Sequence, residues 1–159
     1  MPVEESANAI LMAAAAGYAD GDWRIAKDNL DLLQLWCSYL LTHGEDPGNQ
    51  MCTDDFAGHL ARNVNLSAKA VMGIAAFGMI LDALGQGAEA KIYRDEAKRR
   101  ANSWLERAAV GDHTALTFDG QGWSLKYNLV WDKLFGLDLL PDSFYSQYSI
   151  SVTGCKEKT

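Results

Sequence analysis

The sequence predicts an all-α domain made of antiparallel helical hairpins. Five segments have the length and the apolar periodicity of helices. These segments alternate between two kinds, one apolar on every side and the other apolar along one face only. A helix of the first kind has to be covered all round, whereas a helix of the second kind covers a neighbour on one side. The alternation therefore indicates two concentric layers of hairpins.

The first three helical segments show this alternation. Residues 3–18 are rich in alanine and apolar nearly all round. Residues 23–42 are amphipathic, with Asp22 placed to cap the N-terminus of the helix and Gly44 placed to end it. Residues 65–84 are again apolar all round. We therefore expect the first and third segments in the inner layer.

The second half of the chain continues the pattern. Gly73 and Gly78, inside the second apolar helix, permit a neighbouring helix to approach closely. Residues 88–109 are amphipathic, and residues 111–123 are predicted to form a glycine-bounded loop with a short extended stretch. A last helix is predicted over residues 125–135.

Length, charge and composition narrow the classes of function. The chain has 159 residues, enough for one domain, and its formal net charge of −7 argues against binding to nucleic acid or to an anionic membrane. Its apolar runs are shorter than the roughly 20 residues that span a bilayer. Glu4 and Glu5 stand where a secretory signal needs positive charge, so no signal peptide is predicted here. The basic stretch at residues 91–100 also contains Asp95 and Glu96, and we interpret it as a solvated helix face.

Each apolar helix is preceded by a cluster of polar side chains. Because antiparallel neighbours place the apolar helices parallel to one another, their N-terminal ends are expected on the same side of the domain. Polar groups there, together with the backbone N–H groups of the first turns, predict a binding site. The alternative is that Asp54 and Asn65 are helix N-caps and that the other side chains are solvated. The three clusters comprise Glu4, Glu5, Ser6 and Asn8; Asp54, Asp55, His59, Asn63 and Asn65; and Trp123, Ser124, Lys126, Tyr127 and Asn128.

The segments that carry these clusters resemble the glutaminase A family of bacteria and fungi. The resemblance rests on three stretches in order: MPVEESAN, DPGNQMCTDDFAGHLARNVNLSAKAVMGI and GDHTALTFDGQGWSLKYNLVWDKLFGLDLLP. It covers residues 1–145 and implies an (α/α)6 toroid similar to that of the six-hairpin glycosidases. Such a toroid has more helices than this chain supplies, so we expect the chain to form part of one. Residues 146–159 depart from the family pattern and are expected to form an irregular tail.

The resemblance implies a reaction as well. Members of the family hydrolyse the side-chain amide of L-glutamine to L-glutamate and ammonia, and no cofactor is expected. The activity is expected of a longer parent protein in the periplasm or outside the cell, and the chain alone is expected to be inactive. Because five helices would leave one flank of residues 3–18 and of residues 65–84 uncovered, copies of the chain are expected to self-associate.

Amide hydrolysis without a metal requires a group that activates water and donors for the developing oxyanion. Two carboxylates in different environments can divide the acid and base roles. Asp55 is the predicted base because Asp54 can serve as a cap, and Lys126 is predicted to hold the α-carboxylate of the substrate. The predicted catalytic residues are therefore Asp55, Glu5 and Asp54, and the predicted substrate-binding residues are Lys126, Tyr127, Asn128, His59, Asn65 and Trp123.

Other interpretations of the same residues stay open. Asp54, Asp55 and His59 could hold a metal ion, and Cys52 could pair with His59 as a nucleophile. Two carboxylates about 5–9.5 Å apart across a groove would suit glycoside hydrolysis instead. A non-catalytic helical-hairpin module that binds a ligand is the remaining alternative, although the sequence has no internal repeat.

Overall fold

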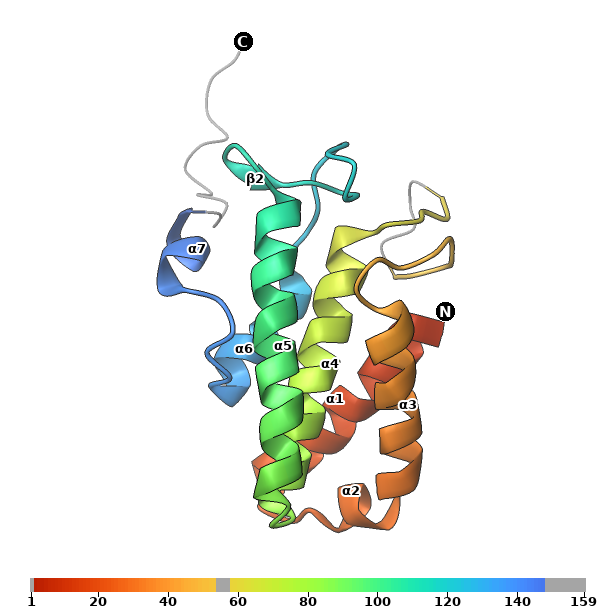
Figure 1. Cartoon of the computed structure of the whole chain (residues 1–159), viewed down its shortest axis with the longest axis vertical. Coiled ribbons are helices and arrows are strands. Elements are labelled where there is room, and N and C mark those ends of the chain that lie inside the picture. The colour runs from red at the N-terminus through yellow and green to blue at the C-terminus, as the bar shows by residue number, and fades with distance from the viewer. Residues whose placement is uncertain (1, 54–57, 148–159) are drawn as a thin grey trace.

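The computed structural model describes residues 2–53 and 58–147, which form a helical domain with one small β-hairpin (Figure 1). The predicted all-α class is confirmed. In chain order the elements are α1 (Pro2–Asp20), α2 (Arg24–Asp28), α3 (Leu30–His43), α4 (Val64–Ala83), α5 (Gly87–Ala108), β1 (Ala109–Val110), β2 (His113–Thr114), the 3-10 helix η2 (Tyr127–Leu129), α6 (Val130–Phe135) and α7 (Asp142–Gln147).

Helix α4 is the centre of the hydrophobic core. Helices α1, α3, α5 and η2 all contact it, and 94% of its most apolar stretch is buried. By length and composition α4 could cross a membrane, but the core helix of a folded domain passes the same test. The expectation that residues 65–84 keep an uncovered flank is wrong, because helices of this chain pack around them. Helix α1 is less completely covered, and its Met12 and Tyr18 are exposed.

Two glycines of α4 allow its neighbours to pack closely, as predicted. A Cβ atom on Gly73 would lie 2.9 Å from Cδ1 of Leu40 in α3 and 3.2 Å from Cα of Ala7 in α1. A Cβ atom on Gly78 would lie 3.2 Å from the backbone oxygen of Ala90 in α5. Both distances to backbone atoms are shorter than ordinary van der Waals contact, so these helices pack directly against the backbone of α4.

The single helix predicted over residues 23–42 is broken into α2 and α3 at Asn29. The side-chain amide of Asn29 donates to the backbone oxygen four residues earlier, at 2.9 Å, and its ψ of 20° departs from the helical value. The prediction of the N-cap is also wrong by one residue. Trp23 occupies the N-cap position of α2, while Asp22 accepts a hydrogen bond from the backbone N–H of Arg24 at 3.1 Å.

The C-terminal elements differ from the prediction in detail. Strands β1 and β2 pair antiparallel at the start of the predicted loop, which accounts for its extended stretch. The predicted last helix begins only at Tyr127, first as η2 and then as α6. Gly136 ends α6 in the left-handed conformation, with a φ of 63°, as glycines at helix ends commonly do. The short helix α7 lies beyond the predicted helices.

The basic stretch of α5 is partly an internal contact rather than a solvated face. Arg100 is buried, and it donates hydrogen bonds to the carboxylate of Glu96 at 2.6 Å and to the backbone oxygen of Leu41 at 2.8 Å. The ammonium group of Lys98 donates to the backbone oxygen of Asp138 at 2.6 Å. For Arg100 the solvated interpretation is wrong, because this buried side chain joins α5 to α3. Lys98 is exposed and joins α5 to the segment that precedes α7.

Candidate functional site

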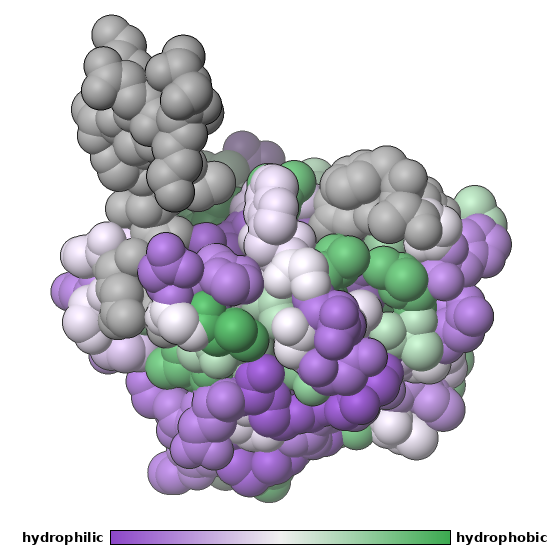
Figure 2. Space-filling model, turned by 90° about the horizontal axis from the view of Figure 1, so that it is seen from above, coloured by the Kyte–Doolittle hydropathy of each residue, from purple (hydrophilic) through white to green (hydrophobic). Residues whose placement is uncertain are grey.

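The beginnings of α1, α4 and η2 lie together, as predicted from the alternation of helices. Glu4 near the start of α1 contacts Lys69 in the second turn of α4, and Asn128 in η2 contacts Asn65 in the first turn of α4. Figure 2 looks down on the end of the molecule at which α4 begins, where hydrophobic side chains reach the surface in separate patches between hydrophilic ones. The polar clusters therefore converge at one end of the helices.

Glu4 is buried and is held by three hydrogen bonds. Its carboxylate accepts one from Lys69 Nζ at 2.5 Å, one from the backbone N–H of Thr53 at 2.7 Å and one from the Thr53 hydroxyl at 2.8 Å. Burial alone would raise the pKa of Glu4, but the hydrogen bonds from Lys69 and Thr53 together outweigh it and lower the pKa below its usual value. The charged carboxylate of Glu4 thus joins α1 to α4 and to the segment at Thr53.

The first turn of α4 is capped by Asn63, whose side-chain oxygen accepts a hydrogen bond from the backbone N–H of Leu66 at 2.8 Å. Asn65 is therefore not this cap, and that part of the alternative is wrong. Asn65 instead accepts two hydrogen bonds from the side-chain amide of Asn128, at 3.0 Å on its side-chain oxygen and at 3.2 Å on its backbone oxygen. Both asparagines are buried and join η2 to α4.

The structure describes only some of the other predicted site residues. Asp54 and Asp55 lie outside the described residues. Glu5 is exposed and lines a groove of about 510 Å³ between α1 and α3, which Trp36 and Tyr39 also line. His59 is exposed, whereas Cys52 is buried. Trp123 is also exposed, with 61% of its surface accessible.

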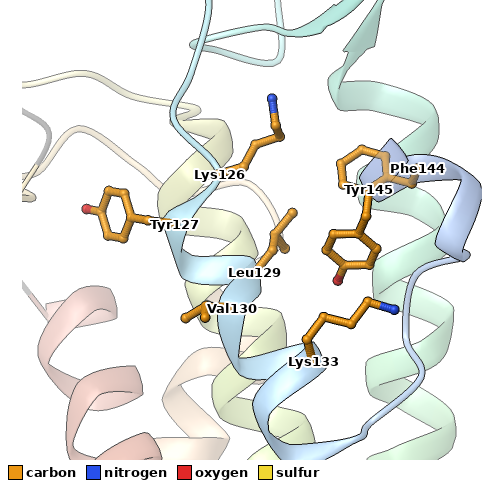
Figure 3. Close-up of a pocket in the computed structure, with 7 residues that line it drawn as sticks. All are labelled: Lys126, Tyr127, Leu129, Val130, Lys133, Phe144 and Tyr145. Atoms are coloured by element: carbon orange, nitrogen blue, oxygen red, sulfur yellow. The ribbon is translucent and has the colours of Figure 1, made fainter. Parts of the chain in front are cut away.

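Lys126 and Tyr127 line a second pocket, which lies between η2, α6 and α7 (Figure 3). Glu5 and Lys126 therefore line different pockets of the described structure. Burial lowers the pKa of Lys126, because the ammonium ion loses hydration. The catalytic and binding roles of the predicted site residues stay predictions.

Lys69 is a polar residue of this region that was not predicted from the sequence. It is the only charged side chain in residues 64–81, and this lone charge in a mostly apolar helix was the signal in the sequence. A lysine on a helix that is covered all round needs a buried acidic partner. The two glutamates at the start of α1 were the available partners, and the structure assigns that role to Glu4.

Asp132, another carboxylate near this region, is also engaged in structure. It is buried and accepts hydrogen bonds from the backbone N–H groups of Leu139 at 2.8 Å and Leu140 at 3.2 Å. The hydroxyl of Tyr145 donates to it at 2.5 Å. Burial raises the pKa of Tyr145, and the neighbouring carboxylate of Asp132 raises it further. Asp132 therefore holds the segment between α6 and α7 against α6.

The hypothetical metal site has no counterpart among the residues that the structure describes, which contain no group of three or more histidine, cysteine, aspartate or glutamate side chains placed to hold an ion. Two of its three proposed ligands, Asp54 and Asp55, lie outside those residues, so the hypothesis stays a prediction.

Comparison with known proteins identifies the family. A family model described as "Glutaminase A six helical-hairpin domain" matches residues 1–150. The chain belongs to this family. The predicted family is confirmed. A domain of helical hairpins also agrees with the mostly helical structure described above.

Two curated relatives bear related names. A protein named "Glutaminase A" from Aspergillus oryzae is 33% identical over 163 residues, which cover 99% of this chain and 24% of the relative. A protein named "Probable glutaminase" from Arthroderma benhamiae is 33% identical over 112 residues, which cover 67% of this chain and 13% of the relative. The chain thus spans a quarter or less of the length of these relatives. No solved structure matches the chain.

Proposed function

We propose that the chain forms part of the hydrolase domain of a glutaminase A-type amidohydrolase that converts L-glutamine to L-glutamate and ammonia. The observation that carries this proposal is the match of almost the whole chain to a protein named glutaminase A. The convergence of polar groups at the beginnings of α1, α4 and η2 supports it, because amide hydrolysis needs several positioned hydrogen-bonding groups.

The reaction requires water to attack the side-chain carbonyl carbon while a base accepts a proton from that water. The carbon–nitrogen bond then breaks, and the nitrogen leaves as ammonia after it has gained a proton. Glu4 is a poor candidate for the base, since its carboxylate already accepts three hydrogen bonds. The exposed Glu5 and the predicted base Asp55 remain, with Asp54 as the third carboxylate.

The same family relationship supports two further parts of the proposal. The hairpins formed by residues 2–147 would be one section of an (α/α)6 toroid completed by the rest of a longer protein. That longer protein would act in the periplasm or outside the cell. In this arrangement the 159-residue chain alone lacks part of the substrate site and has no activity.

The proposal is tested by measuring ammonia release from L-glutamine with the longer protein and, in parallel, with the 159-residue chain. Asp55→Asn preserves the shape of the side chain and removes a base, so it should lower kcat about 100-fold or more. Asp28→Asn at the end of α2 is the matched control and should leave kcat unchanged.

Two outcomes would contradict parts of this proposal. Absence of glutamine hydrolysis by the folded longer protein would overturn the function. An unchanged kcat in Asp55→Asn would remove Asp55 from the base role, and the same assay on Glu5→Gln would then test the second carboxylate.

A further inference from the structure

The pocket between η2, α6 and α7 has the features of a small-molecule site (Figure 3). We propose that it binds a small carboxylate whose remaining part is apolar or aromatic. The pocket has a volume of about 280 Å³, close to the lower end of the roughly 300–1,000 Å³ of typical small-molecule sites. It is lined by Lys126, Tyr127, Leu129, Val130, Lys133, Phe144 and Tyr145.

Lys126 provides the charge that selects an anion. Its side chain is half-buried at the edge of the pocket, and among residues 2–53 and 58–147 no hydrogen-bond or ion-pair partner is found for its ammonium group. Burial lowers the pKa of Lys126, because the ammonium ion has lost part of its hydration. A bound carboxylate would supply the missing partner through a charge-assisted hydrogen bond.

Lys133, the second lysine of the pocket, already has a partner. Its ammonium group lies 2.5 Å from a carboxylate oxygen of Asp142 and 4.4 Å from the centre of the Tyr145 ring. The hydrogen bond to Asp142 raises the pKa of Lys133. Within the part of the chain that the structure describes, the pocket therefore offers one positive charge without a partner, which suits a monocarboxylate better than a dianion.

The walls of the pocket determine the rest of the ligand. Leu129 faces the rings of Phe144 and Tyr145 across the pocket (Figure 3). The hydroxyl of Tyr145 donates to Asp132 at 2.5 Å, so this residue offers the ligand mainly its ring. An aromatic ring can pack against these side chains edge to face or offset. L-glutamine has no apolar body to cover these walls, and we expect it to bind less tightly than an arylalkyl carboxylate.

A binding experiment with defined probes tests this inference. The dissociation constant of phenylacetate for the 159-residue chain is measured by titration in ¹H–¹⁵N NMR spectra, alongside phenylacetamide, acetate and L-glutamine. Phenylacetate should bind with shifts at the residues of the pocket. Phenylacetamide lacks the charge and acetate lacks the apolar body, so each should bind about tenfold or more weakly.

Two lysine variants of similar shape locate the charge. Lys126→Met should weaken phenylacetate binding about tenfold or more, and Lys126→Arg should retain it. Lys133→Met is the matched control, and it should change the dissociation constant about threefold or less because Asp142 already neutralises Lys133. Far-UV circular dichroism confirms that each variant is folded.

Four outcomes would overturn the inference: no phenylacetate binding, equal binding of phenylacetamide, an unchanged dissociation constant in Lys126→Met, or tighter binding of L-glutamine through Lys126. The last of these would assign the pocket to the amidohydrolase substrate. Because binding is measured without turnover, the result is separate from the outcome of the glutaminase assay.

Discussion

Glu4 of α1 and Lys69 of α4 form a buried ion pair, with 2.5 Å between Nζ of the lysine and the nearer carboxylate oxygen. The two residues are 65 positions apart in the sequence, and their side chains are 2% and 7% exposed. Thr53 adds two hydrogen bonds to the same carboxylate. The pair therefore joins the beginning of α1, the second turn of α4 and the segment that immediately precedes Asp54 and Asp55 in the sequence.

Breaking this pair from one side should destabilise the protein strongly. Removal of one partner leaves the other as an uncompensated buried charge, which costs about 3–5 kcal/mol. We expect that loss for Lys69→Met in the free energy of unfolding measured with urea. Combining it with Glu4→Gln should cost less than the sum of the two single substitutions, because no buried charge then remains.

An exposed ion pair gives the matched control. Lys91 and Asp95 form an i,i+4 pair on the surface of α5. Lys91→Met should change the free energy of unfolding by about 1 kcal/mol or less. Equal losses in Lys69→Met and Lys91→Met would show that burial of the Glu4–Lys69 pair does not determine its contribution.

The same carboxylate should make stability depend on pH. The pKa of Glu4 is lowered in the folded protein, below its ordinary value of 4.5. Unfolded chains bind the proton more readily, so the contribution of Glu4 to stability is complete above pH 4.5 and is lost as the pH falls through the lowered pKa.

Glu4→Gln isolates this contribution. We expect the free energy of unfolding of the variant to fall less steeply than that of the unsubstituted protein as the pH decreases below 4.5. Other acidic groups act in both proteins, including Glu96, whose hydrogen bond from Arg99 lowers its pKa to about 2, and their effect cancels in the difference. Parallel pH profiles in urea unfolding would contradict the assignment.

Gly44 ends α3 where the backbone of this helix meets α4. A Cβ atom at this position would lie 2.5 Å from Cβ of Ala70 and 2.7 Å from the backbone oxygen of Leu40. We therefore expect Gly44→Ala to lower the free energy of unfolding by about 1–3 kcal/mol through overpacking. Gly48→Ala is the control, since a Cβ atom there meets nothing within 4 Å. If both variants unfold at the same urea concentration, the close approach of α3 and α4 is not required.

The periodicity of apolar residues was sufficient to predict α1, α4 and α5 and the burial of α4. Residues 65–81 have no polar face, and nearly all of them are buried in the structure. The break at Asn29 was not predictable in the same way, because neither glycine nor proline marks it. It depends on a side chain that competes for a backbone oxygen of its own helix.

The sequence alone does not determine which of two adjacent carboxylates is buried. Glu4 and Glu5 lie about 100° apart around a helix, so only the packing of α1 against α4 determines which one is buried. The sequence therefore predicted Glu5 as a catalytic residue and gave no role to Lys69. The pocket at Lys126 could not be predicted from the sequence either. One of its walls comes from α7, and the periodicity of apolar residues did not reveal that helix.

Exposed apolar side chains lie on two outer surfaces of the domain. Leu32 and Leu35 are exposed on α3, and Val130 and Leu134 are exposed on α6. Each pair lies three or four residues apart, so it forms a stripe on one face of its helix. Since α4 is covered within the chain, we propose that copies associate through these stripes rather than through α4.

Substitution within one stripe tests this proposal. Leu35 is 64% exposed, so Leu35→Glu should disturb the fold little while placing a charge in the middle of the apolar surface. We expect the mass of the 159-residue chain, measured by sedimentation velocity, to rise with concentration, and Leu35→Glu to reduce that rise. Gln34→Glu adds the same charge to an exposed position of the same helix and should behave like the unsubstituted chain. A monomer at every concentration, or equal association of Leu35→Glu and Gln34→Glu, would show that the α3 stripe does not bind a second copy.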